Sequence, residues 1–209
     1  MKPAPFDLHP SVAYVQAVIA NLPAKTGKDL AAWVALARSA KLADGKALGA
    51  WLKSQGLGGT QAGLVAERAL ALPGHAFSDT PEGYLAAAAG YVDSQYSGTK
   101  VGLRPIFDTV LTWARKELPG VKVCPCETIV PLYREHVFAQ LKPTTRTRVD
   151  LGLALGDPNH LKASGGPLVD TGGYAKKDRI TVRLELKAPA DFNAKAQAWL
   201  RAAFERDAS

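Results

Sequence analysis

The sequence has few of the side chains that carry redox or cross-linking chemistry. Its 209 residues include two cysteines, one methionine and four histidines. A disulfide between Cys124 and Cys126, which are separated by one residue, would close a strained ring. The cysteine count therefore excludes a disulfide framework, and such sparse usage is typical of a reducing compartment.

Long apolar runs are also missing. No segment approaches the roughly 18 apolar residues of a membrane-spanning helix, and the start MKPAPFDLHPSVAYV lacks the apolar stretch of a secretory signal. We therefore expect a cytoplasmic protein with no membrane partner. Hydrophobic residues make up 47% of the chain and charged residues 22%, which is sufficient for a folded core.

The common catalytic motifs are absent as well. The sequence has no H-E-x-x-H helix, no G-x-S-x-G turn and no G-x-x-x-x-G-K-[ST] phosphate loop. We predict no cofactor and no catalytic residue, which favours a binding protein over an enzyme. The best metal candidates, Cys124, Cys126 and His136, lack a fourth ligand and the usual cysteine spacing, so we expect no metal.

The chain carries a net charge of +7. Residues 1–78 contain 8 Lys+Arg and 4 Asp+Glu, whereas the remaining residues contain 18 and 15. The positive excess per residue is greater in the front part, and a positive field attracts polyanions such as nucleic acid. A solubilising surface is the simpler explanation for an excess of this size.

Helical periodicity dominates the first part of the chain. Apolar residues recur at helical spacing in residues 11–22 and again in residues 45–55. Between them, Thr26 and Asp29 form a T-x-x-D start signal, and the residues that follow it show the same spacing. Thr60 is placed to cap a fourth helix. Four short amphipathic helices are typical of a small bundle, because each apolar stripe needs a partner.

The segment LPGHAFSDTP marks a boundary, since it is rich in Pro, Gly, Ser and Asp. We predict a helical bundle domain in residues 1–72, a linker and connecting helix in residues 73–98, and an α+β domain in residues 99–209. The last part contains a strong amphipathic helix over residues 103–118 and a closing helix capped by Asp191. Its predicted strands are 121–124, 128–133, 137–141, 148–155 and 180–186.

The order of these elements predicts the fold class. Helix, adjacent strands and helix indicate a mainly antiparallel sheet covered by helices on one face, so the chain is an all-α bundle plus an α+β domain. The segment Gly156–Asp178, with seven Gly and Pro residues, is predicted to be a long loop between strands, and loops of this length are usually functional or mobile.

Several segments resemble two bacterial families. YVQAVIANLPAKTGKDLAAW and KALGAWLKSQGLGGTQAGLV resemble domain of unknown function 4287. LRPIFDTVLTWARKEL, CPCETIVPLYREHVFAQLKP and RVDLGLAL resemble domain of unknown function 5655. The resemblance implies a bacterial two-domain protein with the first family N-terminal to the second. It implies no activity, because neither family has an established one.

A Gly-rich turn is the strongest functional motif. WLKSQGLGGTQAGLV resembles the hairpin of helix-hairpin-helix DNA-binding modules. Glycine lets the backbone approach a phosphate closely, and the amides at a helix start favour an anion. The alternative is that glycine only ends one helix and begins the next. The predicted nucleic-acid-binding residues are Lys53, Gly56, Gly58, Gly59 and Thr60.

A second basic group is predicted on the sheet and beside the long loop. If these side chains converge, they form a groove for phosphate or another acidic ligand. If they do not, they are a solvated sheet face whose charges prevent aggregation. The predicted ligand-binding residues are Tyr133, His136, Arg146, Arg148, Lys162, Lys176, Lys177 and Arg179.

Two functions of different class follow from these features. The first is a non-enzymatic binding protein that contacts nucleic acid or another polyanion through the Gly-rich hairpin and the basic sheet face. The second is a protein or enzyme that binds a small molecule, such as a phosphorylated metabolite, in a pocket under residues 156–178. The sequence leaves the oligomeric state open.

Overall fold

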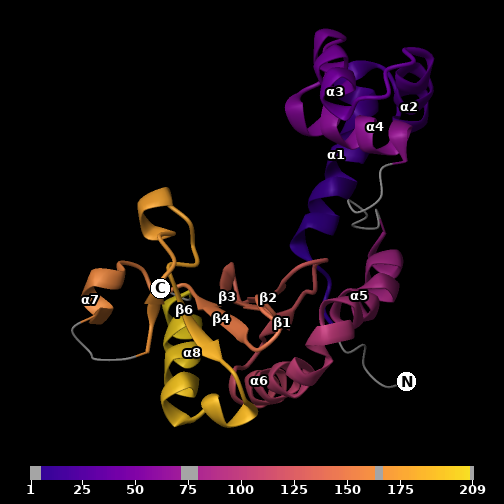
Figure 1. The fold of residues 1–209 in the computed structure, drawn as a ribbon. Coiled ribbons are helices and arrows are strands. Elements are labelled where there is room, and N and C mark those ends of the chain that lie inside the picture. The colour runs from indigo at the N-terminus through magenta and orange to yellow at the C-terminus, as the bar shows by residue number, and fades with distance from the viewer. Residues whose placement is uncertain (1–5, 72–79, 163–166, 208–209) are drawn as a thin grey trace. The chain divides into compact units, whose positions relative to one another are not determined.

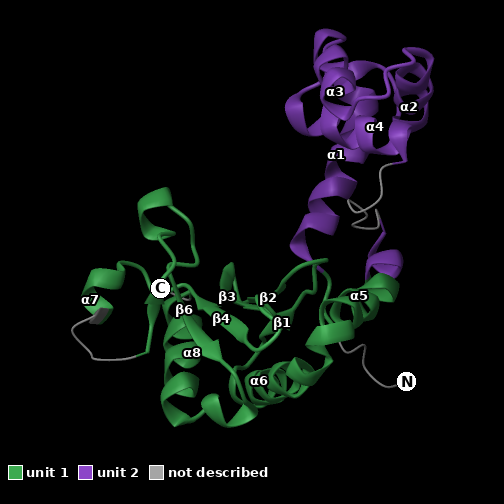
Figure 2. Ribbon diagram, viewed as in Figure 1, with its two compact units in different colours: residues 1–8, 85–209 green, residues 9–84 purple. Residues whose placement is uncertain are grey.

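The computed structural model describes residues 6–71, 80–162 and 167–207 (Figure 1). The chain divides into two compact units, which Figure 2 colours separately. The helical unit comprises His9–Tyr84, and the sheet unit comprises Met1–Leu8 with Leu85–Ser209. The boundary falls inside helix α5, Pro81–Gln95. Most of the predicted linker segment, residues 72–79, lies outside the described residues.

Four helices precede α5 in the helical unit: α1 (Pro10–Thr26), α2 (Leu30–Ser39), α3 (Gly45–Ser54) and α4 (Gly59–Leu70). Side chains from all four enter one apolar core, and burial of each large side chain contributes roughly 1.5–3 kcal/mol. This confirms the predicted helical bundle. The largest core residues are Leu22, Trp33, Leu48, Leu52 and Leu57.

The start of α2 differs from the prediction. Asp29 is its N-cap, and Oδ1 of Asp29 accepts a hydrogen bond from the amide of Ala32 at 2.8 Å. The prediction that Thr26 opens this helix is wrong, because Thr26 is the last residue of α1. The Thr26 hydroxyl instead donates to the carbonyl of Leu22 and accepts from Nε1 of Trp33, both at 2.7 Å.

The sheet unit continues from α5 through the 3₁₀ helix η1 (Gly98–Leu103) and α6 (Arg104–Glu117) into a six-stranded sheet. All its strand pairs are antiparallel, in the order β1-β2-β3-β4-β6-β5. The predicted fold class is therefore confirmed. The strands are β1 (Lys122–Val123), β2 (Val130–Tyr133), β3 (Val137–Lys142), β4 (Val149–Leu153), β5 (Val169–Asp170) and β6 (Val182–Leu186).

Alternation along β4 and β6 gives the sheet one apolar and one polar face. Leu151 lies opposite Leu184 and both are buried, whereas the neighbouring pair Asp150 and Glu185 is partly exposed. Helix α8, Ala194–Arg206, packs against β3 and β4. The polar face is consequently the one on which charged side chains meet.

The segment Gly156–Asp178 is more regular than predicted. It contains the short helix α7 (Pro158–Lys162), strand β5 and the 3₁₀ helix η2 (Tyr174–Lys176). The expectation of a continuous loop between strands is wrong here, because β5 pairs with β6 and extends the sheet by one strand. This pairing is a long-range contact that local composition does not reveal.

The cap of the closing helix also differs from the prediction. Asp191 belongs to the 3₁₀ helix η3, Pro189–Asp191, and does not cap α8. The N-cap is Asn193, whose Oδ1 accepts hydrogen bonds from the amides of Lys195 and Ala196 at 3.0 and 3.3 Å. Among the described residues, no helix is both long enough and apolar enough to span a membrane.

Candidate functional site

The turn between α3 and α4 is built on two glycines with different tasks. Gly56 has a φ of 97°, which glycine adopts without the strain of a side chain. Gly58 is the N-cap of α4, and its amide donates to Oε1 of Gln61 at 2.9 Å. Leu57 between them is buried and anchors the turn in the core. The prediction that Thr60 caps α4 is therefore wrong, since the cap lies two residues earlier.

The first amides of α4 belong to surface residues. Gly58, Gly59 and Thr60 are all exposed, and the first intrahelical bond of α4 runs from the amide of Ala62 to the carbonyl of Gly58 at 2.9 Å. The amides of Gly59, Thr60 and Gln61 precede this bond, so the helix itself offers them no acceptor. Their partial positive charge and the helix dipole favour an anion at this end.

These residues border a hollow of about 380 Å³, which we call the hairpin hollow. It lies entirely within the helical unit, where α1 packs against α4. One wall is therefore a helix face and the other is a helix start. The hairpin hollow is lined by Tyr14, Ala17, Val18, Asn21 and Lys25 from α1 and by Gly58, Gly59, Thr60 and Gln61.

The hairpin hollow has a positive lining. Lys25 stands in its wall, and none of the described lining residues is Asp or Glu. Lys53 adds a second cation, since its Cε lies 3.9 Å from the place where a Cβ on Gly59 would stand. Tyr14 is 56% exposed, and its hydroxyl donates to Oγ1 of Thr60 at 3.4 Å. The site thus combines two lysine side chains, helix-start amides and an aromatic ring.

The structure brings most of the predicted nucleic-acid site together. Gly58, Gly59 and Thr60 line the hairpin hollow, Lys53 reaches toward it, and Gly56 shapes the turn. Sequence reasoning missed the contribution of α1, because its residues precede the turn by more than thirty positions and follow no motif. The missed residues are Tyr14, Asn21 and Lys25.

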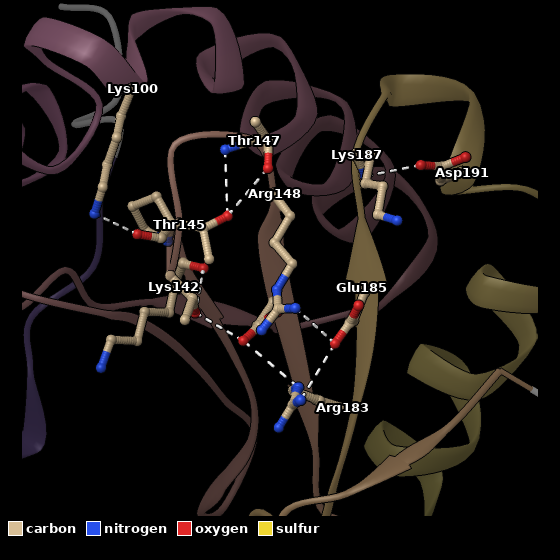
Figure 3. Close-up of polar contacts among 12 residues, drawn as sticks. Lys100, Lys142, Thr145, Thr147, Arg148, Arg183, Glu185, Lys187 and Asp191 are labelled. Atoms are coloured by element: carbon tan, nitrogen blue, oxygen red, sulfur yellow. Dashed lines mark hydrogen bonds and ion pairs between the residues drawn. The ribbon is translucent and has the colours of Figure 1, made fainter.

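The polar sheet face holds a balanced charge network. Figure 3 shows Arg148, Arg183 and Glu185 pointing toward one another. Arg148 lies 2.8 Å from Oε1 of Glu185 and 2.9 Å from Oδ1 of Asp150. Arg183 approaches the same two carboxylates at 3.2 and 3.6 Å. Two guanidinium groups face two carboxylates, so Arg148 adds no net charge to this face.

The remaining predicted ligand-binding residues do not form one groove. Tyr133 is half-buried at the end of β2, and Arg146 is exposed between β3 and β4. Lys177 and Arg179 line a second hollow of about 520 Å³, the loop pocket, beyond the end of β4. Arg148 precedes β4, whose five residues span roughly 16 Å at about 3.3 Å each. The sheet-face and loop residues are therefore separate groups.

The predicted residues His136 and Lys176 lie outside the lining of the loop pocket. Nδ1 of His136 lies 3.3 Å from Oδ1 of Asp207 in the turn between β2 and β3. Lys176 ends η2 and is exposed. Lys162 is the last residue of α7. The charged lining of the loop pocket comprises Lys177, Asp178 and Arg179, with Arg206 at the end of α8 and Asp207 directly after it.

The thiols of Cys124 and Cys126 have raised pKa values and low reactivity. Burial, assisted by the charge of Asp7, raises the pKa of the Cys124 thiol to about 12. Burial and the charge of Glu127 raise the pKa of Cys126 to about 11. Within residues 6–71, 80–162 and 167–207, no three His, Cys, Asp or Glu side chains are grouped to hold a metal ion. Both thiols are therefore protonated near neutral pH and poor nucleophiles.

Comparison with known families adds a classification. The family model described as Domain of unknown function (DUF5655) matches residues 92–207, more than half of the chain. The chain belongs to this family. The model of a second family, Domain of unknown function (DUF4287), matches residues 15–63. This match confirms the prediction that the DUF4287 segment lies N-terminal to the DUF5655 segment. No curated protein and no solved structure matches the chain.

Proposed function

We propose that this DUF5655 member is a binding protein that contacts nucleic acid through the hairpin hollow of its helical unit. The observation that carries the proposal is the meeting of a helix start with Lys25 and Lys53 in a hollow without a carboxylate in its described lining. A phosphate group satisfies helix-start amides and ammonium groups at the same time.

The aromatic ring at the rim favours a single strand. Tyr14 is exposed beside Thr60, so a base that follows the bound phosphate can stack on its ring. Duplex bases are already stacked on their neighbours and gain less from this ring. A preference for single strands over duplex of the same sequence is therefore expected.

The number of cations sets the strength and the salt response. Two lysines at the site correspond to a slope of about −1.4 in log K against log salt for single strands, at about −0.7 per neutralised phosphate. Affinities of non-specific sites lie at roughly 1–100 µM, and so small a basic site belongs at the weak end. The binding is expected to be modest and to fall as salt rises.

Fluorescence anisotropy with labelled single-stranded and duplex DNA, each at two salt concentrations, tests the proposal. Gly59→Glu is the main variant, because it places a carboxylate at the helix start and beside Lys53. A side chain fits there, since the nearest atom to a Cβ on Gly59 is the flexible Cε of Lys53 at 3.9 Å. The neutral variant Gly59→Gln is the matched control for shape.

Lys53→Glu is the second variant, and Lys46→Glu is its matched control. Both lysines are exposed residues of α3, but Lys46 lies near its start and Lys53 near its end. We expect Gly59→Glu and Lys53→Glu to weaken binding at least fivefold and the controls to change it less than twofold. No binding at low salt, or equal losses in the variants and their controls, would contradict the proposal.

A further inference from the structure

The loop pocket of the sheet unit has the size of a small-molecule site. Its volume of about 520 Å³ lies within the range of roughly 300–1,000 Å³ that is typical of such sites. Ala154 lines it just after β4, Tyr174 and Lys177 line it from the η2 turn, and Arg206 and Asp207 line it from the end of α8. Three separate parts of the sheet unit therefore converge on it.

The turn that carries Tyr174 and Lys177 is fastened to the start of β6. Oγ1 of Thr171 donates to the carbonyl of Ile180 at 2.8 Å and accepts from the amide of Gly173 at 3.1 Å. The amide of Asp178 donates back to the carbonyl of Gly173 at 2.8 Å. A Cβ on Gly173 would collide with the carbonyl of Ile180, so only glycine permits this approach. The wall of the loop pocket is thus held in place by its own backbone.

Another part of the loop-pocket lining is held in place by the buried carboxylate of Asp207. The Asp207 side chain is 1% exposed and pairs with the guanidinium of Arg179. Its Oδ2 accepts from the amides of Glu135 and His136 at 3.0 and 2.8 Å. Nε of Arg179 also donates to the carbonyl of Val137 at 3.1 Å. Asp207 and Arg179 therefore neutralise each other and form a fixed part of the lining.

The charged side chains that line the loop pocket sum to a net charge of +1. Lys177, Arg179 and Arg206 oppose only Asp178 and Asp207 in the lining. Lys177 forms no ion pair with any described residue. The pocket consequently favours an anion with one or two negative charges over a highly charged one.

The other walls suit an aromatic ring with polar substituents. Tyr174 is 52% exposed at the rim, and Ala154 and Ala175 supply apolar surface. Thr181 also lines the loop pocket and is 3% exposed, and its hydroxyl has no hydrogen-bond partner among the described residues. Buried hydroxyls are nearly always hydrogen-bonded, so a polar atom of a bound molecule is an apt partner.

We propose that the loop pocket binds a small anion that carries a planar aromatic ring, with a nucleoside monophosphate as the representative ligand. The ring packs against Tyr174 and the alanines, the anionic group lies against Lys177, and Thr181 bonds to a polar atom of the ligand. This site belongs to the sheet unit and takes a small molecule, so it is independent of the nucleic-acid contact proposed for the helical unit.

Isothermal titration calorimetry on the full chain tests this proposal with four probes. Adenosine 5′-monophosphate contains ring and phosphate, adenosine lacks the phosphate, inorganic phosphate lacks the ring, and 4-hydroxybenzoate carries a carboxylate in place of the phosphate. We expect the monophosphate or the benzoate to bind at least tenfold more tightly than adenosine and inorganic phosphate. Which of the two binds identifies the source of the anionic group.

Neighbouring residues provide matched controls. Lys177→Glu should weaken binding of the tighter probe at least tenfold, whereas Lys176→Glu, one residue away and outside the lining, should change it less than twofold. Tyr174→Ala should weaken it about fivefold through lost stacking, and Tyr14→Ala in the helical unit should have no effect. The proposal is overturned if neither ring-bearing anion binds, if inorganic phosphate binds as tightly as they do, or if Lys176→Glu and Lys177→Glu act alike.

Discussion

Replacement of Asp207 by Asn tests how the sheet unit holds its C-terminal helix. One oxygen of Asp207 accepts two backbone amides from the β2–β3 turn, and the other faces Arg179 and His136. Asn can keep the first pair of bonds through its carbonyl oxygen. Its amino group must then face the Arg179 guanidinium, which loses its carboxylate acceptor and meets a second donor instead.

The expected cost follows from the burial of the two partners. Hydrogen bonds to a charged group contribute about 1.5–3 kcal/mol each. Asp207 is 1% exposed, but the Arg179 side chain is 46% exposed, so solvent screens part of the interaction. We therefore expect Asp207→Asn to lower the free energy of unfolding of the sheet unit by about 2 kcal/mol. This corresponds to roughly 30-fold faster exchange of amides that open only on unfolding of the unit.

Hydrogen exchange of the β3 and β4 amides measures this loss of stability in the sheet unit alone, because both strands belong to that unit. Asp191→Asn is the matched control, because Oδ2 of Asp191 also accepts two backbone amides, from Lys187 and Ala188 at 2.7 and 3.0 Å. Asp191 is exposed and pairs with no described guanidinium, so its change should cost below about 1 kcal/mol. Equal effects of the two substitutions would refute the role assigned to the Arg179 pair. So would an undiminished effect of Asp207→Asn in an Arg179→Gln background.

Two further predictions concern titratable groups. Nδ1 of His9 accepts from the amide of Ser11 at the start of α1, and burial lowers the pKa of His9. The unfolded chain therefore binds the proton at a higher pH than the folded chain does. The free energy of unfolding of the helical unit should consequently fall as pH drops below about 6.5. Urea unfolding at pH 7 and pH 5 measures this difference in stability. The variant His9→Asn keeps a capping acceptor but does not titrate, so it should remove the pH dependence. A pH dependence that survives in His9→Asn would show that another group causes it. At pH 8 the raised pKa values of Cys124 and Cys126 should slow iodoacetamide alkylation about 100-fold or more relative to the urea-unfolded chain, and similar rates by mass spectrometry would contradict their burial.

Local patterns were sufficient where one element determines its own structure. The alternation of Val182, Leu184 and Leu186 predicted β6, and the apolar stripe over residues 103–118 predicted α6. The Gly-rich turn was predictable for the same reason, because Gly56 and Gly58 act within five residues of sequence.

Tertiary competition explains the errors. Thr26 has the side chain of an N-cap, but its hydroxyl is engaged by Trp33 and Leu22, and Asp29 caps α2 instead. Strand β5 has two residues and exists because β6 lies beside it. The paired residues are 12 and 14 positions apart, so a window of strand length contains only one of the two partners.

The candidate sites show the same division. The α3–α4 turn was visible in the sequence, whereas Lys25 and Tyr14 enter the hairpin hollow only through the packing of α1 on α4. Arg148 shows the reverse case. Its charge suggested a basic groove, but Asp150 and Glu185 neutralise it from adjacent strand positions. Charge counting along a sequence cannot distinguish a paired arginine from a free one.

Amide chemical shifts during titration with a short single-stranded oligonucleotide test the nucleic-acid contact most directly. In a ¹⁵N–¹H correlation spectrum of the full chain at low salt, the largest changes should fall on the amides of Gly59, Thr60 and Gln61, with smaller ones at Tyr14 and Lys25. These changes should shrink as salt is added. Shifts confined to residues 85–207, or unchanged amides at the start of α4 under saturating oligonucleotide, would contradict the account.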